Sequence, residues 1–320
     1  MNSPLWLGLD IGGTKLAAGV VTADGAVSGT LVIATEKQRG VDDVLARLMQ
    51  LGHDAVSAAG VTLDDLTGVG IGCGGPLDPR SGRIYSPPNL PGWDDVDIVG
   101  AVSQAFGLPA FLGNDADVAA LAEFTFGGHV AASSLVYLTI STGCGGGTII
   151  EGRPWLGATA SASEFGHMVI DRAGRSCPCG SRGCLEAYVS GPSIAARAAE
   201  ALARDSDSSL SSVSVLRAEH VVEAAAAGDR VATLVWAETT SALGTGLLTI
   251  ANTIDPEVIV LGGGVTRAGS ALLGPTLKAM QGGQLKRPGV APTPVVLSAL
   301  GDEVGIVGAA TLARIMMEDA

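Results

Sequence analysis

One histidine and three cysteines stand close together in the sequence: His167, Cys177, Cys179 and Cys184. Thiolate and imidazole groups are the ligands that Zn²⁺ prefers, and three cysteines with one histidine complete a closed tetrahedral site. The loop around them is polar and rich in glycine, so it offers no apolar face in which ordinary thiols could be buried. The chain has five cysteines, an odd number, which argues against a framework of disulfides. The sequence therefore predicts a structural zinc site.

Two carboxylates flank this group of residues. Glu164 comes just before the histidine, and Glu186 comes just after the last cysteine. A zinc knot would hold both carboxylates in fixed positions, so we expect a scaffold for a polar ligand as well as a structural clip. The other two cysteines, Cys73 and Cys144, lie in apolar, glycine-rich surroundings that suit small packing residues.

A glycine turn near the start of the chain could hold phosphate. It follows an apolar strand predicted over residues 5–10 and comprises Asp10, Ile11, Gly12, Gly13, Thr14 and Lys15. Unobstructed backbone N–H groups, a hydroxyl and an ammonium group suit a phosphate, and the aspartate can reach Mg²⁺ through water. The turn is neither a Walker A loop nor a G-x-G-x-x-G segment, so dinucleotide binding is unsupported.

The same pattern of strand, glycine turn and strand returns in the middle of the chain. A strand predicted at 135–140 leads into the turn 141–147, which contains Thr142 and Gly143. A third loop with Gly263 and Gly264 follows a buried strand predicted at 258–261. One such turn alone would be a plain hairpin as readily as a phosphate site. Their repetition favours phosphate sites and an internal duplication.

Asn114, Asp115 and Asp117 lie where a strand ends and an apolar helix, predicted over 118–126, begins. An Asn or Asp at such a point is usually a helix N-cap, which accounts for one of the three residues. A carboxylate at the mouth of an α/β fold is also a good general base. We assign that role to Asp115.

The composition indicates a globular protein with room for two domains. Of 320 residues, 47% are hydrophobic but only 4% are aromatic, so small aliphatic side chains must build the core. The segment from Met1 to Pro4 lacks the basic start of a signal peptide, and no apolar run is long enough to span a membrane. We therefore expect a soluble, cytoplasmic protein. The net charge of −13 argues against nucleic acid or anionic membrane as partners, but not against a nucleotide.

Predicted strands alternate with predicted helices, which indicates an α/β fold. Further strands are expected at 16–21, from residue 69 into a glycine loop, and at 294–297. Helices are expected at 41–51, 243–254 and 305–317. The segment 205–214 consists largely of serine and aspartate, and we expect a flexible surface loop there.

Together these motifs resemble the ROK family, which comprises repressors, open reading frames of unknown role and sugar kinases. The resemblance runs from about residue 5 to residue 314 and rests on the segments 10–15, 113–115, 142–147, 164–167 and 261–264 and on the Cys-x-Cys-x4-Cys spacing. It implies two duplicated actin-like (ribonuclease H-like) α/β domains around a central cleft, with a zinc knot in the larger one. We expect a small domain at 1–118, with a C-terminal helix at about 305–320 packed back onto it. The large domain is expected at 119–304, with the zinc loop at 164–186.

The resemblance also implies roles for individual residues. Asp115 is the base that deprotonates the 6-hydroxyl of a sugar. The implied sugar-binding residues are Asn89, Gly75, Asn114, Glu164, His167 and Glu186. The residues implied for ATP and Mg²⁺ are Asp10, Gly12, Gly13, Thr14, Lys15, Thr142, Gly143, Gly263 and Gly264. The implied ligands of a structural Zn²⁺ are His167, Cys177, Cys179 and Cys184, with the second ring nitrogen of the histidine facing the sugar.

The activity implied by the resemblance is ATP-dependent phosphorylation of a hexose at its 6-hydroxyl. Glucose is favoured because the segment around Asn89 resembles the glucokinase branch. However, Thr159, Ala160 and Ser163 stand where many family members have Asn, Gly and Gly, in a loop that borders the sugar. Mannose, a cyclitol, or an amino sugar such as kanosamine or N-acetylmannosamine therefore stays open as the acceptor.

Other classes of function fit the sequence less well. A ROK repressor carries a DNA-binding segment before the kinase-like core, whereas here Asp10 comes almost at once and the acidic charge opposes DNA binding. A catalytically silent sugar-binding protein has no need for Asp115 and two phosphate turns. Polyphosphate as a donor would suit a basic groove better than this acidic chain. The resemblance further implies a homodimer or homotetramer.

Overall fold

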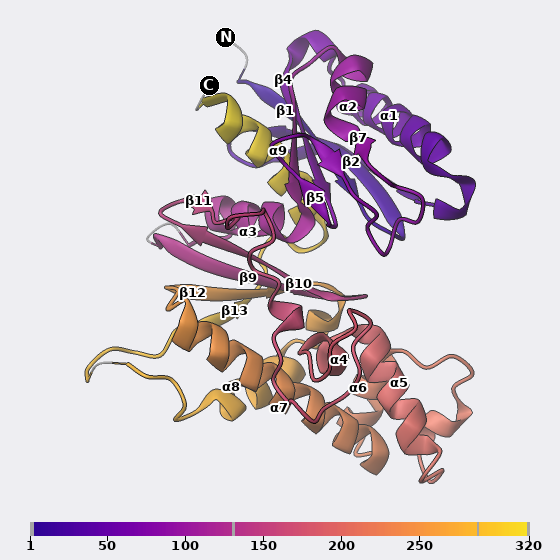
Figure 1. Ribbon diagram of the computed structural model, residues 1–320, viewed down its shortest axis with the longest axis vertical. Coiled ribbons are helices and arrows are strands. Elements are labelled where there is room, and N and C mark those ends of the chain that lie inside the picture. Colours follow the sequence, from indigo (N-terminus) through magenta and orange to yellow (C-terminus); the bar gives the residue numbers. More distant parts are fainter. Residues whose placement is uncertain (1–2, 130–131, 287, 319–320) are drawn as a thin grey trace. The chain divides into compact units, whose positions relative to one another are not determined.

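The computed structural model describes residues 3–129, 132–286 and 288–318, which form an α/β fold (Figure 1). Met1, Asn2 and the last two residues of the helix predicted at 305–320 lie outside the described residues. The chain divides into two units, each with its own core. Unit 1 comprises Met1–Ala132, Gly147–Ala162 and Ala299–Ala320, and unit 2 comprises Ser133–Gly146 and Ser163–Ser298.

Unit 1 is built on a five-stranded sheet of order β3-β2-β1-β4-β8. Its strands are β1 (Leu5–Ile11), β2 (Lys15–Thr22), β3 (Val27–Ala34), β4 (Leu66–Cys73) and β8 (Ala110–Asn114). The first three strands pair antiparallel, whereas β4 and β8 run parallel to β1. The parallel strands bring their carboxyl ends to one edge, which is where open α/β sheets place their ligands.

The side chains of β1 alternate between the two faces of this sheet. Leu7 and Leu9 pack in a core with residues of α1 (Val41–Ala58) and α2 (Ile98–Phe106). Trp6 packs on the other face against α9 (Val304–Glu318). Figure 1 shows α9 beside β1, on the side away from α1 and α2. Gly8 lets this helix approach closely, because a Cβ atom added there would lie 2.2 Å from the carbonyl oxygen of Ile306.

Helix α3 (Asp115–Phe126) packs on the same C-terminal helix. A Cβ atom added at Gly308 would lie 2.0 Å from the carbonyl oxygen of Val118, so the two helices touch through their backbones. The domain boundary predicted between residues 118 and 119 falls inside α3. The helix stays whole in unit 1 because its buried face depends on α9.

A second five-stranded sheet has the order β11-β10-β9-β12-β13. Its strands are β9 (Ser134–Ile140), β10 (Cys144–Ile150), β11 (Arg153–Pro154), β12 (Val258–Gly262) and β13 (Val295–Leu297). Strand β12 pairs in parallel with β9 and with β13, just as β4 pairs with β1 and β8. The two sheets share one strand order, which confirms the predicted α/β class and duplication. The division between the units passes through β10, after Gly146.

The helices of unit 2 cluster on the part of this sheet that belongs to the unit. They are α4 (Glu186–Val189), α5 (Gly191–Leu202), α6 (Ala218–Ala226), α7 (Arg230–Thr253) and α8 (Ser270–Met280). Leu243 and Leu247 of α7 share a core with Val136 and Leu138 of β9. No helix in the described part of the chain is long and apolar enough to cross a membrane.

The segment predicted as a flexible loop at 205–214 is anchored at its centre. It contains a 3-10 turn at Ser209–Ser212, in which Leu210 is buried. The carboxylate of Asp229 accepts hydrogen bonds from the Ser208 hydroxyl and from the Ser209 backbone N–H, the latter at 2.7 Å. The serine-rich segment is therefore ordered around its 3-10 turn by Asp229.

A small three-stranded sheet orders the segment between β4 and α2. It comprises β5 (Leu77–Asp78), β6 (Arg83–Ile84) and β7 (Val96–Asp97). Trp93 and Leu90 are almost fully buried, and the Ser86 N–H donates to the Trp93 carbonyl at 2.8 Å. These contacts hold the exposed Asn89 on a fixed loop.

Candidate functional site

The carboxyl edge of the first sheet collects three of the site residues predicted from the sequence. Asp10 lies near the end of β1, and the next residue, Ile11, is in register with Cys73 of β4. Cys73 is in turn in register with Asn114 of β8, and Asp115 follows as the first residue of α3. The sheet topology thus gathers Asp10, Asn114 and Asp115 from segments that are about 100 residues apart in the sequence.

The two carboxylates at this edge both have raised pKa values. The pKa of Asp10 is raised to about 6, chiefly by burial and then by the negative charge of Asp115, while Lys15 acts in the opposite direction. The pKa of Asp115 is also raised, chiefly because protein crowds its carboxylate, although this residue stays exposed to solvent. A reachable carboxylate with a raised pKa can accept a proton, and a second one beside it suits a cation.

Asn114 is the N-cap of α3, as the sequence pattern allowed. Its side-chain oxygen accepts from the Ala116 N–H at 2.9 Å, and Asp115 Oδ1 accepts from the same N–H at 2.8 Å. Gly74 and Gly75 run alongside. A Cβ atom at Gly75 would lie 3.5 Å from Asn114 Nδ2, and one at Gly74 would lie 3.8 Å from Asp115 Oδ2. Gly75, Asn114 and Asp115 are therefore neighbours, as their predicted roles require.

The first glycine turn connects β1 to β2 and touches the Asn89 loop. The Gly12 N–H donates to the Lys15 carbonyl at 2.9 Å, and the Thr35 hydroxyl donates to the Gly12 carbonyl at 2.6 Å. A Cβ atom at Gly13 would lie only 2.6 Å from the Cβ of Asn89. A residue predicted to bind phosphate thus contacts one predicted to bind sugar.

The second glycine turn, between β9 and β10, is tied to Glu186. The Cys144 N–H donates to Glu186 Oε2 at 2.8 Å, and a Cβ atom at Gly143 would lie 2.9 Å from the same oxygen. Gly263, with φ of +90°, packs on this turn, since a Cβ there would lie 2.5 Å from the Ile140 carbonyl oxygen. Gly143 and Gly263 therefore permit close packing, a role separate from the phosphate binding predicted for them.

Two other glycines of the same region have a role that the sequence did not reveal. A Cβ atom at Gly146 would lie 2.4 Å from the ring of Phe165, and one at Gly166 would lie 1.8 Å from the Cys144 carbonyl oxygen. The segment Glu164–His167 therefore packs directly on the start of β10. The one hint of this packing in the sequence is the aromatic Phe165 directly before Gly166, and in the structure Phe165 is buried.

A cavity of about 1020 Å³ opens beside the second turn. It is lined by Ser141 and Thr142 of the turn, Gly191 and Pro192 at the start of α5, and Gly264; the charged residues on its wall are Arg217, Arg267, Glu219 and Glu223. A helix N-terminus and an open glycine loop suit a phosphorylated ligand, and the two arginines add positive charge that the two glutamates offset. Arg217 and Arg267 were not singled out from the sequence, because nothing in the pattern sets them apart from other arginines.

The four residues of the predicted zinc site come together. Their ligand atoms all lie within 4.8 Å of one another. The sulfur atoms of Cys179 and Cys184 are 3.7 Å apart, and Cys177 Sγ is 3.8 Å from His167 Nδ1. A tetrahedral Zn²⁺ with Zn–S bonds of about 2.3 Å separates its sulfur ligands by about 3.8 Å. The cluster therefore fits zinc in both ligand chemistry and spacing.

The thiol pKa values describe the cluster in the absence of a metal ion. Burial raises the pKa of Cys177 to about 12 and raises that of Cys184, while the backbone N–H of Ser181 lowers the pKa of Cys179. Two of the three sulfur atoms thus keep their protons near neutral pH without a cation. Zinc would displace those protons, which couples metal binding to the fold of this loop.

The loop that departs from the common family pattern adopts a left-handed backbone at two positions. Ala160 has φ of +54° and Ser163 has φ of +65°, a region that side chains other than that of glycine occupy at some energetic cost. Both stand where the family resemblance expects glycine. The chain thus keeps the glycine-like backbone while it adds two side chains.

The predicted site residues form two sets, each assembled within one unit. Unit 1 contains Asp10, Gly12, Gly13, Thr14, Lys15, Gly75, Asn89, Asn114 and Asp115. Unit 2 contains Thr142, Gly143, Glu164, His167, Cys177, Cys179, Cys184, Glu186, Gly263 and Gly264.

Comparisons with known proteins agree with these features. The chain matches the ROK family over residues 6–315. It is 31% identical over 312 residues to a glucokinase of Thermotoga maritima, covering 96% of each chain. It is 30% identical to a kanosamine kinase of Amycolatopsis mediterranei, covering 99% of this chain and 98% of the relative. The crystal structure of a Streptomyces griseus ROK glucokinase with glucose and AMPPNP is similar with a TM-score of 0.83 and 33% identity, covering 97% and 99% of the two chains.

The metal cluster yields a first prediction. Purified protein should contain one Zn²⁺ per chain by elemental mass spectrometry, and Cys179→Ser should lose most of it, because a thiolate ligand is removed. Cys73→Ala serves as the control, since this buried cysteine lies in unit 1, outside the cluster. Full zinc content in Cys179→Ser would exclude the assigned ligand set.

The paired carboxylates yield a second prediction, on stability. Because the folded pKa of Asp10 is about 6 against an ordinary 3.8, its contribution to stability is complete below pH 3.8 and is lost as the pH rises through 6. Without added Mg²⁺, the unfolding free energy of the wild type should therefore fall between pH 4 and 6 by up to about 1.4 kcal/mol per pH unit more than that of Asp10→Asn. The exposed Asp64→Asn is the control. If the unfolding free energies of wild type and Asp10→Asn changed in parallel with pH, the raised pKa of Asp10 would be contradicted.

Proposed function

Because the chain belongs to the ROK family, we propose that it transfers a phosphoryl group from ATP to the 6-hydroxyl of a hexose, with glucose as the preferred acceptor. The observation that carries this proposal is Asp115, a solvent-reachable carboxylate at the start of α3 whose pKa is raised. A carboxylate whose pKa lies nearer to neutral is a stronger proton acceptor. Phosphoryl transfer otherwise needs mainly positioning and charge stabilisation.

In the proposed reaction the residues of unit 1 handle the proton and the attacking oxygen. Asp115 takes the proton of the sugar hydroxyl, whose oxygen forms a bond to the γ-phosphorus as the bond to the bridging oxygen of ADP breaks. Asn114, Gly75 and Asn89 line the path of the sugar. Asp10 would hold Mg²⁺, whose charge offsets that of the donor phosphates when it is bound. Gly12, Gly13, Thr14 and Lys15 contact those phosphates.

In unit 2 the zinc loop and the second glycine turn hold the two substrates. Glu164, His167 and Glu186 bind sugar hydroxyls. Glu186 uses Oε2 for the Cys144 N–H, which leaves Oε1 for the sugar. Thr142, Gly143, Gly263 and Gly264 bind donor phosphates, and the adjoining cavity takes the nucleoside. Structural zinc held by His167, Cys177, Cys179 and Cys184 keeps the loop in shape.

The choice of sugar is the part of the proposal that a direct assay decides. The similarity to glucokinases supports glucose, while the similarity to a kanosamine kinase and the altered residues Ala160 and Ser163 support an amino sugar as the second candidate. ADP release should be measured with ATP and glucose, mannose, kanosamine, N-acetylmannosamine or a cyclitol. We expect the highest kcat/KM with glucose, and a preference for any other sugar would overturn that assignment.

The role of the base yields a further prediction. Asp115→Asn should lower kcat by at least about 10²-fold, the usual size of a lost general base, because an amide cannot accept the proton. The sugar affinity should stay within a few-fold, since the amide keeps the shape and a hydrogen bond to Ala116 N–H. Steady-state kinetics and glucose titration separate these effects. Turnover close to that of the wild type would exclude Asp115 as the base.

A further inference from the structure

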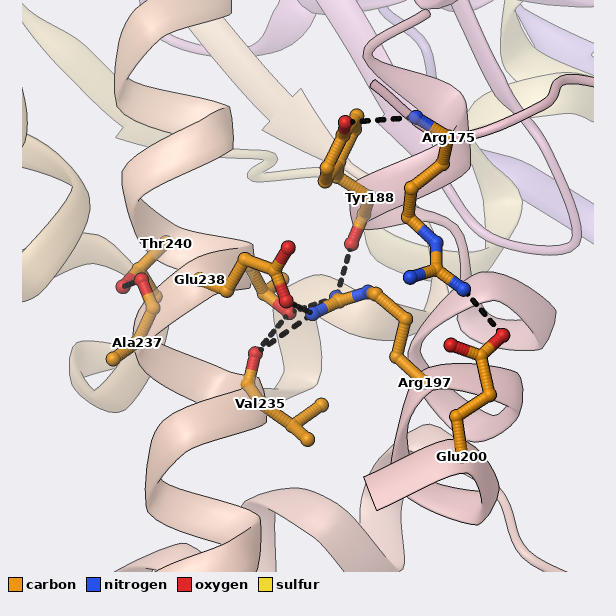
Figure 2. A network of polar contacts seen from close by, with 9 residues as sticks. Arg175, Tyr188, Arg197, Glu200, Val235, Ala237, Glu238 and Thr240 are labelled. Carbon is orange, nitrogen blue, oxygen red and sulfur yellow. Dashed lines mark hydrogen bonds and ion pairs between the residues drawn. The ribbon is translucent and has the colours of Figure 1, made fainter. Parts of the chain in front are cut away.

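Arg197 is a buried cation in unit 2 that no proposed catalytic step uses. Its side chain is 2% exposed, and burial lowers the pKa of the guanidinium group. Figure 2 shows it reaching from α5 to the neighbouring helices. It donates to the Val235 carbonyl at 3.0 Å and to Glu238 Oε2 at 2.9 Å, both on α7.

A third helix, α4, is also held by this side chain. Arg197 donates to the hydroxyl of Thr239 on α7 and to the backbone carbonyl of Tyr188 on α4. Carbonyls in the last turn of a helix lack partners within the helix, and a cation there is favourable. A buried charge of this kind seldom adds stability over an apolar side chain of equal size. The function of Arg197 is therefore better sought in how it orients α4 than in any gain in stability.

Helix α4 has only four residues, too few to be stable alone. Its orientation must come from the contacts at its two ends. At the first end, Glu186 binds the Cys144 N–H, and Cys184 of the zinc cluster lies two residues earlier. At the second end, the Tyr188 phenol accepts from the Arg175 N–H at 3.1 Å, which ties α4 to the part of the zinc loop just before Cys177 (Figure 2).

We propose that Arg197 is a positioning residue that acts through α4 and holds the Glu186 carboxylate against the glycine turn. The chain of contacts runs from the guanidinium to the Tyr188 carbonyl, back two residues along α4 to Glu186, and on to the Cys144 N–H. The expected effect on catalysis rests on the proposed function, in which Glu186 binds sugar and the turn binds donor phosphate. The expected effect on the order of α4 does not depend on the proposed function.

The test compares Arg197→Met, which keeps length but removes charge and hydrogen bonds, with Arg197→Lys, which keeps the charge. Arg197→Met should raise the sugar KM roughly tenfold or more, the size of one lost hydrogen bond to a charged group. Arg197→Lys should lie between it and the wild type, because lysine can reach fewer of the four acceptors at once. Arg204→Met, an exposed arginine just past the end of α5, is the matched control.

A second control separates the α7 contacts from the α4 contact. Glu238→Gln removes the charge of the exposed partner but leaves the bond to Tyr188, so its sugar KM should stay within about twofold of wild type. Amide hydrogen exchange adds a readout that needs no activity. In Arg197→Met, exchange should rise in the segments 141–146 and 184–191, while unit 1 is unchanged.

The outcomes are distinguishable. Faster exchange in those segments together with a raised sugar KM supports the proposal. Unchanged exchange there, or reduced stability with an unchanged KM, overturns it, because either result leaves Arg197 with a merely structural role. If the wild type phosphorylates none of the sugars tested, the proposed function fails, but the exchange data still decide whether Arg197 orders α4. Should Arg197→Met fail to fold, the same comparison is made with Arg197→Lys.

Discussion

The hydrogen bond from the Cys144 N–H to the Glu186 carboxylate is the contact on which the candidate site of unit 2 depends. It joins the glycine turn after β9 to the short helix that follows the zinc loop. On its other side, the same cysteine packs against Gly166, whose neighbour His167 belongs to the zinc cluster. The 18 residues between His167 and Glu186 would be costly to order by themselves, and a metal bound by the cluster would supply that order.

The duplicated sheets explain why chemistry-bearing residues recur at strand ends. Each sheet begins with an antiparallel hairpin closed by a glycine turn and continues with parallel strands. The loops that follow the parallel strands therefore lie at the carboxyl edge of both sheets. In the first sheet that edge gathers Asp10 and Asp115. In the second it gathers the turn with Gly143 and the loop with Gly263, beside a cavity that has charged side chains of both signs on its wall. One topology, used twice, thus serves different chemistry.

The sequence predicted the zinc cluster, the two carboxylates at the sheet edge and the glycine turns, because residue type and spacing alone indicate them. It did not predict Arg197, whose role comes from acceptors on α4 and α7 that are far apart along the chain. Nor did it reveal that Gly146 makes room for Phe165, since a glycine that permits close packing looks like one that permits a turn. Asp229, which anchors the serine-rich segment, was missed for the same long-range reason.

The most direct test of the link between the zinc loop and the site is glucose titration of wild-type protein before and after zinc is removed by a chelator. Unit 1 and the sheet core of unit 2 have their own buried clusters, so circular dichroism should show a folded, zinc-free protein. We expect glucose affinity to fall at least about tenfold without zinc, and to return when Zn²⁺ is added back. A folded, zinc-free protein that binds glucose as tightly as the zinc-loaded form would contradict the central role of the loop.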